Sequence, residues 1–273
     1  MNGLISQAQI SDRRGFRRAA VAVSVAAVLF ATFVAGCGHK SSTSQTSGAS
    51  GSPAATSASG APSPQAQQLV ADSSKATTAL RSVHVNLQTT NITTLPMESV
   101  NADVTNQPEG NGQAVGDAMI RLQPRALVVA KQFLVTNKTM YTKNEAGVYT
   151  SVGPAERIYD PGVILDKQKG LGAVIGKVGS PQIAGNETID GVATVKVTGT
   201  VDAAVVDPLL PQIGKNGGTL PVTLYIADVK AAGAPGPTPS PYLVRMVIDK
   251  DQGHVTITLS NWGAPVTIPS PTP

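Results

Sequence analysis

The chain of 273 residues contains very little cysteine, histidine and aromatic side chain. Its single cysteine, Cys37, excludes an internal disulfide and any zinc or iron–sulfur site that needs several cysteines. The three histidines, His39, His84 and His254, lack the spacing of a metal-binding helix pair, so no metal is expected. Aromatic residues make up 4%, so the core must be built from Val, Ile, Leu and Ala. A hydrophobic share of 41% is still enough to bury a core.

Charge is also scarce, and most of the excess positive charge lies near the beginning of the chain. Charged residues make up 14%, with a formal net charge of +4. Four arginines fall within residues 13–18 (RRGFRR), which leaves the rest of the chain nearly neutral. Without a basic stripe in the body, nucleic-acid binding is not expected.

Common catalytic and nucleotide-binding motifs are missing. In GLGAVIGK (170–177), Leu171 stands where a phosphate loop needs glycine, and Val178 stands where Ser or Thr would bind magnesium. No G-x-S-x-G is present, and His84 and His254 alternate with apolar strand residues, which predicts that both face the polar side. We therefore expect neither an enzyme nor a cofactor. A hydrolase that pairs a serine with one of these histidines remains a less favoured hypothesis for the function.

The beginning of the chain has the parts of an export signal. After the arginines comes an uncharged apolar run, 19–35, and then Val34-Ala35-Gly36-Cys37, which resembles a bacterial lipobox. In such signals the cysteine thiol receives a diacylglycerol, and the new amino terminus is acylated after cleavage. We expect residues 1–36 to be a signal peptide and Cys37 to anchor the protein in the inner membrane on the periplasmic side. The alternative is a permanent transmembrane anchor.

The remainder divides into a tether, one domain and a short tail. Residues 37–64 are rich in Ser, Thr, Gly, Ala and Pro, which is typical of a flexible tether. Residues 65–268 alternate apolar and polar side chains in many short runs, which predicts about ten antiparallel strands after one leading helix. Residues 269–273 are expected to be a frayed tail.

The predicted fold is α+β, with one large antiparallel sheet in a single domain. A sheet of this length should curl and leave a concave apolar face that other elements must cover. Helical spacing over 160–180 and a helix over 203–213, capped by Asp202, supply that cover. Gly170 is expected to divide the first of these segments.

Several long segments resemble the mycobacterial LppX/LprAFG lipoprotein family. They include SSKATTALRSVHV (73–85), ESVNADVTNQPEGNGQAVGDA (98–118), FLVTNKTMYTK (133–143), IDGVATVKVTGT (189–200) and LVRMVIDKDQG (243–253). The resemblance implies a half-barrel sheet with helices over an apolar cavity that holds a diacylated glycolipid of the phosphatidylinositol or glycerophosphate type. It also implies transport across the periplasm toward the outer envelope. A lipid exporter or an envelope protein is a candidate partner.

The inward strand positions and the apolar helical positions are candidates for lining that cavity. They are Val85, Leu87, Val104, Ile120, Val129, Phe133, Leu171, Val174, Ile175, Val178, Val195, Leu224 and Met246. The second hypothesis is an interaction or signalling lipoprotein that docks a protein partner and carries no cargo. It predicts a filled core, whereas a carrier needs an open cavity.

Overall fold

A computed structural model describes residues 63–121, 123, 126–214, 216–236 and 239–271. The expected signal peptide, Cys37 and nearly all of the tether lie outside these residues. Eleven strands form one antiparallel sheet. The strands are β1 (Ser82–Thr90), β2 (Met97–Thr105), β3 (Gln113–Arg121), β4 (Val128–Thr136), β5 (Thr139–Lys143), β6 (Tyr149–Pro154), β7 (Gly179–Ile189), β8 (Val192–Asp202), β9 (Thr219–Ala227), β10 (Leu243–Lys250) and β11 (Gly253–Ser260).

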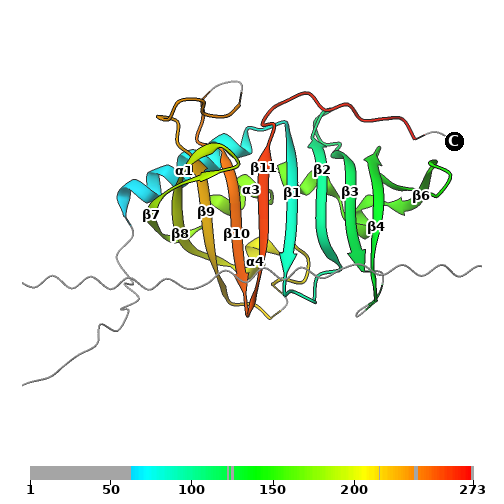
Figure 1. Cartoon of the computed structure of the whole chain (residues 1–273), viewed down its shortest axis with the longest axis horizontal. Coiled ribbons are helices and arrows are strands. Elements are labelled where there is room, and N and C mark those ends of the chain that lie inside the picture. Colours follow the sequence, from blue (N-terminus) through cyan, green and yellow to red (C-terminus); the bar gives the residue numbers. More distant parts are fainter. Residues whose placement is uncertain (1–62, 122, 124–125, 215, 237–238, 272–273) are drawn as a thin grey trace, which may run out of the picture. The chain divides into compact units, whose positions relative to one another are not determined.

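The sheet is open, and its two edges come from the middle of the chain. Its order is β6-β5-β4-β3-β2-β1-β11-β10-β9-β8-β7, so β6 and β7 are the edge strands (Figure 1). The pairing of β1 with β11 joins the two halves of the sheet, and Val85 faces Leu259 in that register. The predicted fold class, a large curled antiparallel sheet with few helices, is confirmed.

Short helices accompany the sheet. They are α1 (Pro64–Thr78), α2 (Ala155–Ile158), the 3-10 helix η1 (Pro161–Leu165), α3 (Leu171–Ile175) and α4 (Ala203–Val206). Helix α1 packs on α3, β7 and β10, whereas η1 packs on β2 and β3. The helices therefore cover different halves of one face of the sheet (Figure 1). Among the described residues, no helix combines the length and apolar character needed to span a membrane.

Alternation of apolar and polar residues produces the sheet's two faces, as expected. In β11 the buried Val255, Ile257 and Leu259 alternate with half-buried polar residues. The core is made of these inward residues and their counterparts on β1, β8, β9 and β10, together with buried residues of α1 and α3. At Gly172 in α3, an added Cβ would lie 2.1 Å from Thr78 Oγ1, so glycine permits the close approach of α1.

The structure corrects the helices predicted in the middle of the chain. The segment 160–180 contains two short helices, η1 and α3, that Gly170 separates, and its last residues begin β7. Asp160 caps the first of them, because its carboxylate accepts a hydrogen bond from Gly162 N at 2.9 Å. Asp202 likewise caps α4, but that helix ends at Val206 rather than 213. Prolines 208 and 211 allow only turns beyond it.

One strand of the sheet has no recognisable pattern in the sequence. Strand β7 was not among the predicted strands, because most of its residues are exposed and no alternation of apolar and polar side chains marks it. Its pairing with β8 shifts register between Gly179 and Gln182 and again between Ile183 and Gly185. An edge strand has only one neighbour, so it can tolerate such irregularities.

Candidate functional site

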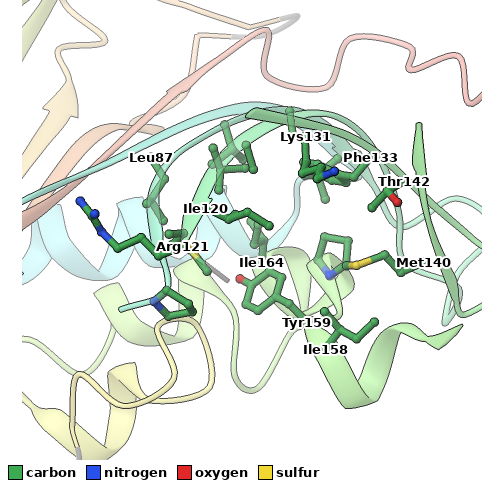
Figure 2. A pocket seen from close by; sticks show the side chains of 18 residues that line it. Leu87, Ile120, Arg121, Lys131, Phe133, Met140, Thr142, Ile158, Tyr159 and Ile164 are labelled. Carbon is green, nitrogen blue, oxygen red and sulfur yellow. The ribbon is translucent and has the colours of Figure 1, made fainter. Parts of the chain in front are cut away.

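An apolar cavity of about 250 Å³ lies between the curled sheet and the segment α2–η1. Its wall comes from β1, β2, β3, β4 and β5, and its opposite side comes from residues 158–164. The lining residues are Val85, Leu87, Pro96, Met97, Val100, Ala102, Val104, Ala118, Ile120, Arg121, Lys131, Phe133, Met140, Thr142, Ile158, Tyr159, Pro161 and Ile164. Figure 2 shows Lys131 and Phe133 on the sheet side and Ile158 and Tyr159 opposite them.

The cavity follows from the strand register and from side-chain size. Val85, Ala102 and Phe133 lie in one row across the sheet, because Val85 pairs with Ala102, and Phe133 and Ala102 both pair with Gly116. The neighbouring row contains Ala118. Alanines at inward positions of β2 and β3 leave space that a leucine would fill, so the sheet retains a hollow here instead of a solid core.

The cover over this hollow is held at two places. The backbones of Gly112 and Gly162 approach so closely that a Cβ added at Gly112 would lie 2.2 Å from Gly162 Cα. This contact seats η1 against the loop between β2 and β3. The hydroxyl of Tyr159 donates a hydrogen bond to the carbonyl oxygen of Leu209 at 3.1 Å. Burial raises the pKa of that hydroxyl, and the Asp160 carboxylate adds to the shift.

Arg121, at one end of the cavity, has its charge compensated within the protein. Its guanidinium forms an ion pair with the Glu98 carboxylate and donates a second hydrogen bond to the carbonyl oxygen of Ala126 at 3.1 Å. Arg121 and Tyr159 are therefore both engaged by protein groups, which leaves most of the wall apolar. A surface of this kind suits flexible hydrocarbon chains better than a polar substrate.

A polar cleft of about 610 Å³ lies on the other side of η1, but most of its charged groups already have partners. Lys167 Nζ lies 2.6 Å from Glu109 Oε1. Asp160 and Asp166 use their carboxylates to accept hydrogen bonds from nearby backbone N–H groups. The apolar cavity is therefore the better candidate for a ligand site.

Five of the predicted cavity residues line this space and eight do not. The five are Val85, Leu87, Val104, Ile120 and Phe133. The eight are Val129, Leu171, Val174, Ile175, Val178, Val195, Leu224 and Met246. Most of these eight belong to the other half of the molecule, where α1 and α3 fill the concave face. Val174, Ile175, Leu224 and Met246 have no exposed surface, so in that half the inward residues form a solid core.

Sequence reasoning missed much of the lining. Val100, Ala102 and Ala118 alternate with more polar residues along β2 and β3, and the register that places them near Val85 marks them as inward. Ile158 and Tyr159 had no such signal, because the short segment that covers the cavity shows neither strand nor helix periodicity.

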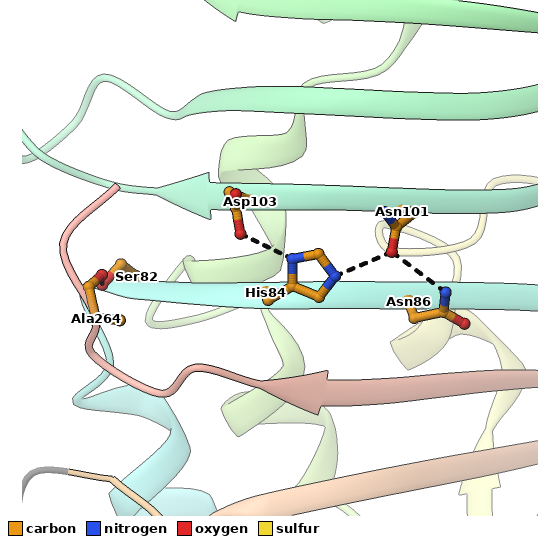
Figure 3. A network of polar contacts seen from close by, with 6 residues as sticks. All are labelled: Ser82, His84, Asn86, Asn101, Asp103 and Ala264. Carbon is orange, nitrogen blue, oxygen red and sulfur yellow. Dashed lines mark hydrogen bonds and ion pairs between the residues drawn. The ribbon is translucent and has the colours of Figure 1, made fainter. Parts of the chain in front are cut away.

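Of the two histidines considered for a hydrolase, His84 lies on the face of the sheet away from the helices (Figure 3). His84 Nδ1 is 2.8 Å from Asp103 Oδ1, and Nε2 is 2.9 Å from Asn101 Oδ1. The nearby Ser82 donates its hydroxyl hydrogen to the carbonyl oxygen of Ala264 at 2.6 Å. Both ring nitrogens are thus occupied, and Ser82 is turned toward the C-terminal segment. The arrangement ties strands together and does not match a serine–histidine pair.

Comparisons with known proteins agree with this architecture. The model of the LppX_LprAFG lipoprotein family matches residues 65–268. LprF of Mycobacterium tuberculosis, which its name describes as a proposed diacylated glycolipid transporter, is 62% identical over 273 residues and 99% of each chain. The lipoarabinomannan carrier protein LprG of Mycolicibacterium hassiacum is 32% identical over 213 residues, which cover 76% of this chain and 85% of LprG.

Two crystal structures share the fold. LprF from Mycobacterium bovis matches with a TM-score of 0.75 and 65% identity, covering 78% of this chain and all of the other. The lipoprotein LppX from Mycobacterium tuberculosis matches with a TM-score of 0.55 and 27% identity, covering 76% of this chain and 99% of the other. The resemblance to this family inferred from the sequence segments is confirmed.

Proposed function

The chain belongs to the LppX_LprAFG lipoprotein family, and from this premise we propose that it carries a diacylated glycolipid across the periplasm toward the outer envelope. The observation that carries the proposal is the apolar cavity beneath β1–β5. Its wall is mostly apolar, and among its lining residues only Arg121, Lys131, Thr142 and Tyr159 bring polar side chains to it. The acyl chains would occupy this space while the sugar-bearing head group remains at its opening.

The energetic demand on such a carrier explains why the cavity must be apolar. Two acyl chains contain about thirty methylenes, and burying each one is worth about 0.8 kcal/mol. Roughly 24 kcal/mol therefore holds the lipid in its bilayer. A protein that removes the lipid must replace most of that stabilisation with its own dry surface. Side chains without hydrogen-bonding groups provide it without leaving unpaired donors or acceptors.

The cavity must also widen when it is filled. Its volume of about 250 Å³ is below the ~300–1,000 Å³ typical of sites for drug-sized ligands. A diacylated lipid is larger than most such ligands. We infer that α2 and η1, the short elements that close the cavity, move away from the sheet when the acyl chains enter.

The anchor completes the proposal. Residues 1–36 act as the signal peptide, and Cys37 carries the diacylglycerol and the N-acyl chain. Residues 37–64 form the tether, residues 65–268 form the lipid-binding domain, and residues 269–273 form the tail. One acyl chain binds a membrane only marginally, whereas two or three hold a protein firmly. The protein would thus remain on the periplasmic side of the inner membrane while its domain reaches outward.

One experiment tests cargo and anchor together. The full gene is expressed in a mycobacterial host, and the protein recovered from its membranes is examined by native mass spectrometry and solvent extraction. We expect a chain that begins at an acylated Cys37, with one diacylated glycolipid bound per protein. A protein that carries no lipid and takes up none from glycolipid vesicles would contradict the carrier function.

The same experiment bears on the alternative of a docking lipoprotein without cargo. That alternative expects a core filled with side chains. The open cavity favours the carrier, and recovery of a protein partner with an empty cavity would favour the alternative.

A further inference from the structure

Two of the four polar side chains in the cavity wall have no partner among the residues that the structure describes. Arg121 is paired with Glu98, and the Tyr159 hydroxyl donates to Leu209 O. By contrast, neither the ammonium of Lys131 nor the hydroxyl of Thr142 forms a hydrogen bond or ion pair with any residue that the structure describes. Both residues are half-buried and belong to the wall that β4 and β5 provide.

The strand register brings these two residues to the same corner of the cavity. Thr142 pairs with Phe133, and Lys131 lies two residues from Phe133 on the same face of β4. Lys131 and Thr142 are therefore diagonal neighbours across adjacent strands, within reach of a common ligand. Figure 2 shows Lys131, Phe133 and Thr142 close together at one end of the pocket.

Lys131 occupies a position where the pattern of the sheet calls for an apolar residue. It pairs with Ala118, which in turn pairs with Val100, and Val100 pairs with Leu87. All three of these partners line the cavity. A lysine can cover apolar surface with its stem and keep its charge in water, but a methionine would cover the same surface without a charge to solvate. The inward lysine is therefore explained best by an anion that arrives with the ligand.

Arg121, the other cationic residue of the cavity wall, is not placed to bind the same anion as Lys131. It lies three residues from Ala118 along β3, which corresponds to about 10 Å along the strand. Its charge is already balanced by the Glu98 carboxylate. The unpaired positive charge of the cavity wall is thus confined to the β4–β5 corner in the described part of the chain.

We propose that Lys131 and Thr142 form a binding subsite for the anionic phosphodiester of an acylated lipid. The inference rests on the proposed carrier function and adds to it the residues that bind the group next to the acyl chains. The ammonium donates charge-assisted hydrogen bonds to the phosphate oxygens, and the Thr142 hydroxyl donates one more. The acyl chains then run from this corner along the apolar wall toward Val85 and Leu87.

The test measures a preference between two lipids that share their acyl chains. The full chain, freed of lipid, is incubated with vesicles containing equal amounts of dipalmitoyl phosphatidylglycerol and dipalmitoylglycerol, and bound lipids are counted by native mass spectrometry. We expect the wild type to favour the phosphodiester lipid. Lys131→Met, which keeps the stem and removes the charge, should lower the ratio of the two bound lipids about tenfold, equivalent to about 1.4 kcal/mol.

Matched variants separate this role from a general effect of charge. Thr142→Val should lower the ratio about threefold, and Lys131→Arg should largely retain it. Lys196→Met removes a half-buried strand lysine from β8, outside the cavity, and should leave the ratio unchanged. An unchanged ratio in Lys131→Met, or an equal fall in Lys196→Met, would overturn the proposal.

Three further outcomes are distinguishable. A wild type that takes up neither lipid would contradict the carrier function itself, whereas uptake of dipalmitoylglycerol with no preference for the phosphodiester would overturn only the subsite. Binding of inorganic phosphate that Lys131→Met abolishes, in a wild type with no preference between the two lipids, would assign the corner to a free anion and overturn its assignment to a lipid head group.

Discussion

At the scale of single residues, the cavity depends on small side chains as much as on apolar ones. Ala102 and Ala118 are almost completely buried, with exposed fractions of 3% and 8%, yet their side chains stop at Cβ. Alternation along the strands predicts which of these residues face inward. It does not predict that the space in front of them stays empty, because that depends on how closely a distant segment packs.

Filling the hollow from Ala118 should impair lipid binding without unfolding the protein. A phenylalanine there projects into the cavity and displaces about three methylenes of an acyl chain, which corresponds to ~2 kcal/mol or roughly a thirtyfold loss of affinity. Lipid uptake from vesicles measures the loss, and urea denaturation checks that the fold survives. Ala130→Phe is the matched control, because Ala130 is exposed on the opposite face of β4. Equal losses in both variants would argue against the cavity.

The polar residues of the wall show where prediction from alternation fails. Lys131 and Thr142 occupy inward positions of β4 and β5, but a polar residue in an alternating strand is normally assigned to the solvent side. Their register with Ala118 and Phe133 reveals their true direction. Departures from the pattern of this kind are expected at functional sites, where binding chemistry overrides packing.

At the scale of elements, the short cover formed by α2 and η1 differs most from expectation. Apolar residues at helical spacing predicted one helical segment over 160–180 that Gly170 divides. The apolar residues in fact serve two different surfaces, since Ile164 faces the cavity and Leu171 joins the core beneath α1. A helical pattern predicts that one face is buried, but it does not tell against which neighbour. Gly170, by contrast, does divide the segment as predicted, because η1 ends before it and α3 begins directly after it.

Releasing the cover should speed lipid exchange. Tyr159→Phe keeps the ring in the cavity wall and removes only the hydrogen bond to Leu209 O, at a cost in unfolding free energy of about 1 kcal/mol. Because α2 and η1 must move to admit acyl chains, we expect exchange between protein and vesicles to become several times faster. Stopped-flow transfer of a fluorescent lipid measures the rate. An unchanged rate would show that this bond does not restrain the cover.

The same bond predicts how stability changes at high pH. Burial raises the folded-state pKa of the Tyr159 hydroxyl above its ordinary value of about 10, so the folded protein favours the protonated form. Its contribution is fully present below pH 10 and is lost as the pH rises from there toward the folded-state pKa. The advantage of wild type over Tyr159→Phe should therefore shrink as the pH rises above 10 in urea denaturation. A constant difference would mean that the hydroxyl is not buried.

At the scale of the whole sheet, the two halves of the concave face serve different purposes. Beneath β8–β11, helices α1 and α3 fill the face, and residues such as Ile175 and Leu224 are completely buried. Beneath β1–β5 the described part of the chain covers it only with the short segment that contains α2 and η1, and the cavity remains. The sequence predicted the sheet and its curl from the strands alone. It did not predict this division, because the leading helix α1 lies far in sequence from the strands it covers.

This division predicts in which backbone amides a bound lipid will change the rate of hydrogen exchange. With native-state hydrogen exchange, we expect added lipid to protect backbone amides of β4 and β5 and to alter exchange in residues 155–165, which must move to admit the chains. Amides in α1, α3 and β8 should change little, because the solid core there has no room for a ligand and its local unfolding does not depend on one. Protection centred on Leu171, Val174 and Val178 would instead mean that acyl chains enter the half under α3. The comparison is internal to one sample, so it separates a local ligand from a general gain in stability, which would slow exchange in both halves together.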